Sequence, residues 1–173
     1  MAIEHFLSDT TEPSRPTSSE AAVDEILQEA SRPLASEPGL DFSAVEERMQ
    51  KIMEEYAGGS TENYETSRDK LLLARSYLED LEHRSNDMFA DTPHALMRTH
   101  ETADRIVLAR LLVEHLLARR ETRWPVYQTR LDYPLRNDLE FNVFINSCLK
   151  NGHITIYKRE PAPPYERAPL ENA

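Results

Sequence analysis

The sequence predicts a mainly α-helical protein: a three-helix bundle followed by an extended arginine- and proline-rich segment and a small β-hairpin. Three observations predict it. Apolar residues recur at helical spacing in three stretches between residues 41 and 120. Two prolines interrupt any helix after Arg120, and an Asn-Gly pair then separates two strand-like runs. The 173 residues, of which 39% are hydrophobic, suffice for one domain with a real core.

Residues 1–41 are predicted to be a mostly disordered acidic N-terminal arm. Four prolines stand among many Ser, Thr and Glu residues, a composition that buries too little apolar surface to offset its ordering entropy. Residues 1–60 hold 13 acidic and 4 basic residues, so most of the net charge of −11 belongs to the front of the chain. The stretch SSEAAVDEILQEA at 18–30 is an exception, because Ser18 or Ser19 can cap it and Ala22 and Ile26 follow helical spacing. We expect a helical turn or docking helix there.

Three helices follow in order within a domain at 42–160. The first begins at Asp41 and ends at Gly58-Gly59. The second begins near Thr66 or Ser67 and ends around 89–91, and the third covers about 94–120, after Pro93. Its wide apolar arc predicts a central helix that is contacted on more than one side. The apolar stripes comprise Val45, Met49, Ile52, Met53 and Tyr56; Leu71, Ala74, Leu78, Leu81 and Met88; and Leu96, Ala103, Ile106, Val107, Val113, Leu116 and Leu117.

The pattern changes after Arg120. Pro125 and Pro134 exclude a continuous helix, so residues 122–139 are expected to be an extended or turning segment, here called the crossing segment. The runs FNVFINSCL and HITIYK then bracket Asn151-Gly152, which predicts a hairpin with a type I′ turn. Residues 161–173, with four prolines, are expected to be a non-helical tail.

Several function classes are excluded or disfavoured by these residues. No segment offers the basic footprint that nucleic acid needs. The chain has no H-E-x-x-H motif, no C-x-x-C pair, no glycine-rich phosphate loop and no paired Glu-x-x-His motifs on facing helices. No serine stands in a strand–turn–helix elbow. We therefore predict no catalytic residue, no cofactor-binding residue and no metal ligand in this chain.

The cysteine content and the apolar runs bear on location. The single cysteine, Cys148, forms no internal disulfide and is expected to be a half-buried side chain in a strand rather than a catalytic thiol. The longest apolar run is too short to span a membrane, and MAIEHFLSDTTEPSRPTSSE lacks the features of a signal peptide. We expect a cytoplasmic protein.

The candidate functional feature is a cluster of arginines and aromatic residues around the crossing segment. It comprises Arg119, Arg120, Arg123, Arg130 and Arg136 with Trp124, Tyr127 and Tyr133. Two interpretations stand side by side. The arginines can neutralise Glu121, Asp132 and Asp138 and pin the segment to the bundle. Alternatively, the cluster is a contact surface, because Trp, Tyr and Arg dominate interface energetics.

The sequence also resembles a known family over about residues 44–160. The pieces MQKIMEEYAGGSTENYETSRDKLLLA, DTPHALMRTHETADRIVLARLLVEHLLARRETRWPVYQTRLDYP and FNVFINSCLKNGHITIYKR resemble the C-terminal helical domain of adenylylsulfate (APS) reductase alpha subunits. More broadly, they resemble that of fumarate reductase and succinate dehydrogenase flavoproteins. The most specific pieces are EYAGG…NYE and ETRWP-x-Y-x-x-R-x-DYP.

The resemblance implies an oxidoreductase role without catalysis by this chain. In the family, FAD-binding and capping domains precede the helical domain, and residues 1–43 are not expected to hold them. The resemblance implies a helical subunit that packs on a FAD-binding flavoprotein subunit and helps dock an iron–sulfur electron-transfer subunit. The expected partner contacts are Arg123, Trp124, Tyr127, Arg130 and Tyr133. The alternative is an accessory or regulatory protein that binds a complete flavoprotein complex, with the acidic arm as its effector segment.

Two departures from the family pattern lie in the crossing segment. Val126 stands where the family has glycine after Trp-Pro, and Asn137-Asp138 and Glu140-Phe141 replace Asp-Asp and Asn-Trp pairs. A β-branched residue avoids backbone angles that suit glycine alone. We therefore expect the chain to take a different local course at Val126.

Overall fold

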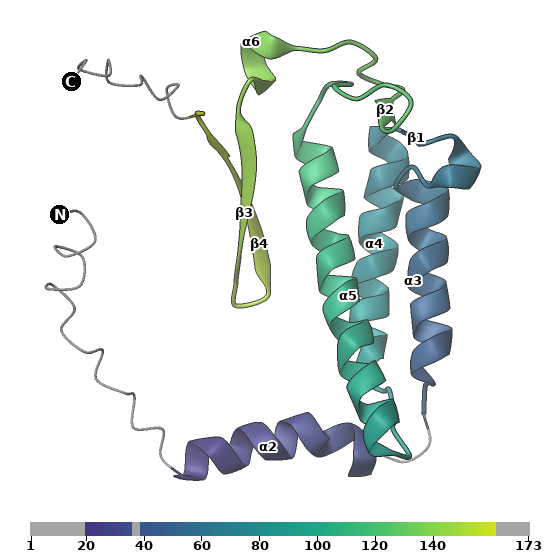
Figure 1. Cartoon of the computed structure of the whole chain (residues 1–173), viewed down its shortest axis with the longest axis vertical. Helices are drawn as coiled ribbons and strands as arrows, with labels where there is room; N and C mark the ends of the chain where they lie inside the picture. Colours follow the sequence, from purple (N-terminus) through teal and green to yellow (C-terminus); the bar gives the residue numbers. More distant parts are fainter. Residues whose placement is uncertain (1–19, 36–38, 162–173) are drawn as a thin grey trace, which may run out of the picture.

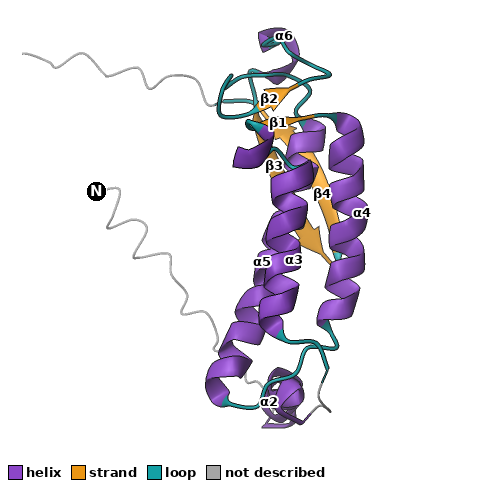
Figure 2. Ribbon diagram, turned by 90° about the vertical axis from the view of Figure 1, so that its right-hand side faces the viewer, coloured by secondary structure: helices purple, strands orange, loops and turns teal. Residues whose placement is uncertain are grey.

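The fold is a helical bundle with a hairpin along its side, seen in a computed structural model that describes residues 20–35 and 39–161. The helices α3 (Phe42–Tyr56), α4 (Arg68–Ser85) and α5 (Pro93–Ala118) run up, down and up (Figure 1). The strands β3 (Phe144–Lys150) and β4 (His153–Arg159) form a hairpin that runs along the bundle, next to α5 (Figures 1 and 2). The helix α2 (Glu20–Ala35) crosses one end. The predicted fold class is confirmed.

Each bundle helix begins at a side-chain cap. Asp41 accepts a hydrogen bond from the Ser43 N–H at 2.8 Å, and Ser67 and Thr92 accept from N–H groups three residues ahead. These bonds satisfy donors that the first helical turn leaves unpaired. Pro93 occupies the first turn of α5, as predicted.

The second helix is shorter than predicted, because α4 ends at Ser85 rather than around 89–91. The backbone beyond it bonds to Leu40 instead of continuing the helix: Leu40 N–H donates to the Asp87 carbonyl, and Phe89 N–H to the Leu40 carbonyl. Met88 was predicted on the apolar stripe of this helix. It lies in the loop after the helix, and its side chain is buried. The third helix likewise ends two residues early, at Ala118.

The core lies between the three bundle helices. Its buried residues include Val45, Met49, Ile52, Leu71, Ala74, Leu78, Leu81, Met88, Ile106, Val113 and Leu116, all on the predicted stripes. The helix α5 contacts α2, α3, α4 and both hairpin strands, so it is the central helix that its wide apolar arc predicts.

The helix α2 is longer than the helical turn or docking helix expected at 18–30. Its C-terminal half is attached to the end of the bundle: the Pro33 carbonyl accepts from Ala90 N–H at 2.9 Å, and the His100 ring lies 2.8 Å from the Ala30 carbonyl. Ser18 and Ser19, residues 1–19 of the expected arm and residues 162–173 of the expected tail lie outside the described residues.

The hairpin has the predicted turn but a different exposure. Asn151 and Gly152 have φ values of +51° and +75°, as a type I′ turn requires. Cys148 is exposed, so the expected half-burial was wrong, because the last three residues of β3 before the turn, Cys148 to Lys150, are all exposed. Within the described ranges, the helices include none long and apolar enough to cross a membrane.

Candidate functional site

The crossing segment carries the chain from the end of α5 over the end of the bundle to the hairpin (Figure 1). It contains two short elements that the sequence did not predict, β2 (Thr129–Arg130) and α6 (Asp138–Phe141). The strand β2 pairs in parallel with β1 (Glu65–Thr66), which follows the short helix η1 (Ser60–Glu62). Thr129 N–H donates to the Tyr64 carbonyl and Leu131 N–H to the Thr66 carbonyl. The segment is therefore held to the loop between α3 and α4.

Arg130 is the buried anchor of the segment, with 2% of its side chain exposed. Its Nε and Nη2 donate to the two carboxylate oxygens of Asp132, at 3.0 and 2.8 Å. Its Nη1 donates to the carbonyls of Leu116 and Arg119 at the end of α5. A cation at a helix C-terminus is favourable because the last carbonyls carry partial negative charge. One side chain thus ends α5 and fixes the direction of the segment that follows.

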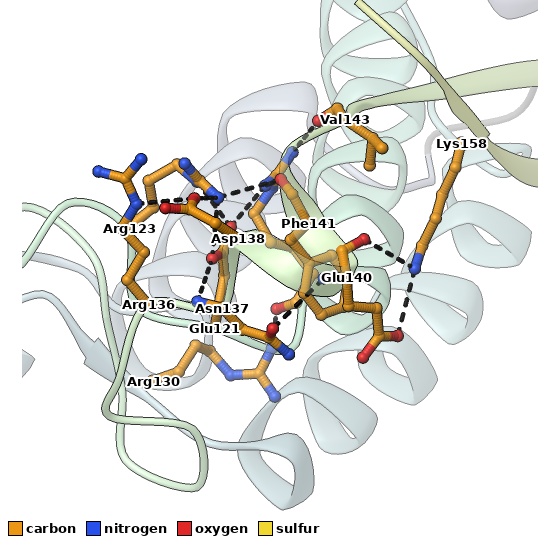
Figure 3. Close-up of polar contacts among 11 residues, drawn as sticks. Glu121, Arg123, Arg130, Arg136, Asn137, Asp138, Glu140, Phe141, Val143 and Lys158 are labelled. Carbon is orange, nitrogen blue, oxygen red and sulfur yellow. Dashed lines mark hydrogen bonds and ion pairs between the residues drawn. The ribbon is translucent and has the colours of Figure 1, made fainter.

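Glu121 is the second buried charge, with none of its side chain exposed. Its carboxylate accepts from Arg119 Nη1 and Arg123 Nε, both at 2.7 Å, and from the Asn137 N–H at 2.8 Å (Figure 3). Burial alone raises the pKa of Glu121, but hydrogen bonds from Arg123, Asn137 and Arg119 outweigh it, so the pKa lies below its ordinary value. The charged carboxylate therefore links the two ends of the crossing segment.

An outer layer of ion pairs extends this network to the hairpin. Asp138 accepts from Arg136 and Arg123, and these hydrogen bonds lower its pKa, that from Arg136 most. Glu140 accepts from Arg120 at 2.6 Å. It also accepts from Lys158 of β4 at 3.2 Å (Figure 3). Its pKa is lowered by these contacts, that of Arg120 most. The prediction that the arginines neutralise Glu121, Asp132 and Asp138 and pin the segment is confirmed.

The outward side of the crossing segment is apolar. Trp124 is 68% exposed and Tyr127 77% exposed. Val126, Leu131, Leu135 and Leu139 are also more than half exposed. Large side chains gathered in this way on one short segment are typical of an interaction surface. We call these six residues the apolar rim.

Val126 occupies a backbone conformation that the sequence argues against. Its φ is +76°, in the left-handed region. We expected a β-branched residue to avoid such angles, and that expectation was wrong. The conformation costs a β-branched residue about 1–3 kcal/mol and persists only where the surroundings impose it.

The five residues predicted to contact a partner differ in their exposure to solvent. Trp124 and Tyr127 are exposed, Arg123 and Tyr133 are half-buried, and Arg130 is buried. Donors of Arg130 are engaged inside the chain, by Asp132 and by the end of α5. For all five residues, partner contact stays a prediction.

Two features of the site were missed from the sequence. Thr122 is buried, and its hydroxyl accepts from the Arg130 N–H and donates to the Tyr133 carbonyl, both at 2.9 Å. The leucines of the apolar rim, at 131, 135 and 139, recur every four residues in a proline-broken segment. Leucines at helical spacing in a segment that cannot form a helix were the available signal for exposed apolar side chains.

No metal or cofactor position emerges from the described part of the chain. Its residues contain no group of three or more His, Cys, Asp or Glu side chains placed to hold a metal ion. What the site can do is present a rigid, partly aromatic surface.

Comparison with known proteins defines the class. Residues 46–162 match the C-terminal region of the fumarate reductase flavoprotein, and the chain belongs to this family of oxidoreductase domains. The adenylylsulfate reductase subunit alpha of Megalodesulfovibrio gigas is 33% identical over 100 residues, which are 58% of this chain and 15% of that protein. The resemblance read from the sequence is confirmed.

Comparison with solved structures supports the same family. Adenylylsulfate reductase from Archaeoglobus fulgidus superposes with a TM-score of 0.79 at 31% identity, over 87% of this chain and 26% of that one. A variant of E. coli quinol fumarate reductase has a TM-score of 0.71 at 19% identity, over 88% of this chain and 28% of that one, and shows the shared fold. The chain thus spans about a quarter or less of the length of these relatives.

Proposed function

We propose that this chain is a non-catalytic helical subunit of a FAD-dependent oxidoreductase resembling APS reductase. It packs on a flavin-bearing subunit and helps to dock an iron–sulfur electron-transfer subunit, in the cytoplasm. FAD and the substrate pocket belong to the partner. The observation that carries the proposal is the apolar rim, exposed on a domain that matches about a quarter of the APS reductase chain.

The rim has the composition of an interface centre. Tryptophan and tyrosine bury large areas at low conformational cost, and such residues hold most of the energy in many interfaces. The ion pairs of Arg123, Arg130 and Glu121 fix the backbone beneath the rim. A surface that is already ordered loses less entropy on binding than a flexible one.

One observation favours the alternative, an accessory or regulatory protein that binds a complete flavoprotein complex. The helix α2 lies outside the family match at 46–162 and exposes Val23, Ile26 and Leu27. Four acidic residues accompany them, namely Glu20, Asp24, Glu25 and Glu29. An amphipathic acidic helix of this kind suits transient binding in a groove.

The test is purification of the tagged chain from its native host, with the visible absorbance of the complex recorded. A yellow complex with flavin bands, stable on dilution, is expected for a constitutive subunit, because such interfaces are large. The mass of the flavoprotein decides between the two candidates. A partner without its own helical domain supports the subunit, whereas a partner with one supports the accessory protein. A colourless chain would remove the oxidoreductase role.

A further inference from the structure

We propose that the turn at residues 124–127 inserts into an apolar pocket on the flavin-bearing subunit, and that Val126 determines which partner is accepted. The inference rests on the proposed function and adds the contact by which the partner is recognised. Three observations carry it: the geometry of the turn, the exposure of the strained valine, and the charge around it.

The turn is tightly closed. Tyr127 N–H donates to the Trp124 carbonyl at 3.2 Å, and Gln128 N–H donates to the same carbonyl at 2.8 Å. Pro125 occupies the second position of the turn, and Val126, with φ +76°, occupies the third. A type II turn favours proline at the second position and needs a positive φ at the third, where glycine or asparagine is the usual residue.

The strain at Val126 has little compensation inside this chain. The residue is 73% exposed, so its side chain buries little surface against its own fold. Its neighbours Trp124 and Tyr127 are equally exposed. A glycine or asparagine would relax the backbone without removing a packed side chain. Strained residues cluster at functional positions, and the benefit of this valine therefore lies in a contact outside the chain.

The base of the turn is rigid. Thr122 accepts from the backbone N–H of Arg130, so the chain segments before and after the turn are joined by a buried hydrogen bond. Arg130 and Glu121 hold the same backbone through their ion pairs. The three exposed side chains are presented as one fixed surface, which is the arrangement that a pocket recognises at low entropic cost.

Charge indicates the surroundings of that pocket. Residues 119–141 hold five arginines against four acidic residues, and each arginine is paired with a carboxylate of this chain. Arg120 and Arg136 are each more than half exposed, but Glu140 and Asp138 neutralise them. The charges of this region are therefore satisfied within the chain, and the three exposed side chains of the turn match an apolar pocket rather than a charged one.

The experiment compares Val126→Gly and Val126→Asn with the wild-type chain. Both changes relax the backbone and remove the apolar branch, so the melting temperature of the isolated chain should rise by about 3 °C. Affinity for the flavoprotein purified with the wild-type chain should fall about tenfold. The matched control is Leu108→Ala, at a leucine of α5 whose exposure of 62% is similar to the 73% of Val126. Its affinity should equal that of the wild type.

Fluorotryptophan supplies a direct readout, because Trp124 is the only tryptophan in the chain. Its fluorine resonance should show a solvent isotope shift in the free chain and lose it in the complex. If the melting temperature rises in neither of the two variants, the inference is overturned, because the valine would then be unstrained. A higher melting temperature with unchanged affinity would also overturn it, while the proposed function would stand. A wild-type chain that binds no flavoprotein would remove the proposed function and this contact together.

Discussion

Arg130 and Asp132 form a two-pronged ion pair at the point where α5 ends, with nitrogen–oxygen distances of 3.0 and 2.8 Å. The third guanidinium nitrogen binds the Leu116 and Arg119 carbonyls. Only a planar fork reaches a carboxylate and a helix end at once. The apolar rim therefore rests on a joint that is fixed from inside the chain.

Replacement of Arg130 should show how much the joint stabilises the fold. Arg130→Lys keeps the charge but loses the paired hydrogen bonds to Asp132 and one or both carbonyl contacts. We expect the free energy of unfolding in urea to fall by about 3 kcal/mol, because buried acceptors that Arg130 satisfied lose their hydrogen-bond donors. The control is Arg136→Lys, in an exposed pair with Asp138, which should unfold like the wild type because exposed pairs contribute little. Equal stability of both variants would contradict a structural role for Arg130.

The ion pairs also predict acid sensitivity. The pKa of Glu121 lies below its ordinary value of 4.5, and that of Asp132 below 3.8, because arginine hydrogen bonds outweigh burial. A depressed carboxyl pKa adds stability that is fully present above the unfolded-state pKa and is lost as pH falls through the folded-state pKa. The free energy of unfolding should therefore decline below about pH 4.5.

Urea titrations between about pH 3 and 7 on the wild type and Glu121→Gln check this. The variant should be less stable by about 2 kcal/mol at pH 7, because Arg119 and Arg123 lose a charged acceptor. Its decline toward low pH should be shallower than that of the wild type. An identical slope in both proteins would show that the paired carboxylate is not a source of the acid sensitivity.

The helices and the hairpin could be predicted from the sequence because their signals are local. The spacing of Leu71, Ala74 and Leu78 marks one helix face, and Asn151-Gly152 marks a turn. Met88 shows the limit: it fell in register with that face by chance, while the residues on either side of it, Asp87 and Phe89, bond to Leu40 in a distant part of the chain.

The candidate site was less predictable because its geometry is set by long-range packing. By residue type, Arg130 and Trp124 are equally good candidates for an interface, yet Arg130 is buried and Trp124 is exposed. Which of them faces solvent depends on the parallel pairing of β1 with β2, two residues on each side, which leaves no local pattern. Val126 adopts its φ against its own preference, so local propensity predicts the opposite.

Two glycines should respond differently to alanine. At Gly59, with an ordinary φ of −72°, an added Cβ would lie 2.5 Å from the Glu54 Cα. That backbone cannot move aside easily, so Gly59→Ala should lower the free energy of unfolding by about 2–3 kcal/mol. At Gly152 the Cβ meets open space, and only the φ of +75° opposes it, at about 1 kcal/mol. Thermal unfolding of the two variants measures the difference, and a larger loss at Gly152 would contradict the close approach at Gly59.

Trp124→Ala separates interface energy from folding energy. Because Trp124 is 68% exposed, its removal should leave the melting temperature of the isolated chain close to that of the wild type. In the complex it should weaken association with the flavin-bearing subunit by about 2 kcal/mol or more, as expected of a central aromatic contact. Calorimetric titration of both proteins measures the affinity. Leu108→Ala, at an exposed leucine of α5, is a control for the loss of exposed apolar surface in general. An unchanged affinity for Trp124→Ala would remove this residue from the interface, and a large loss of thermal stability would show that it serves the fold instead.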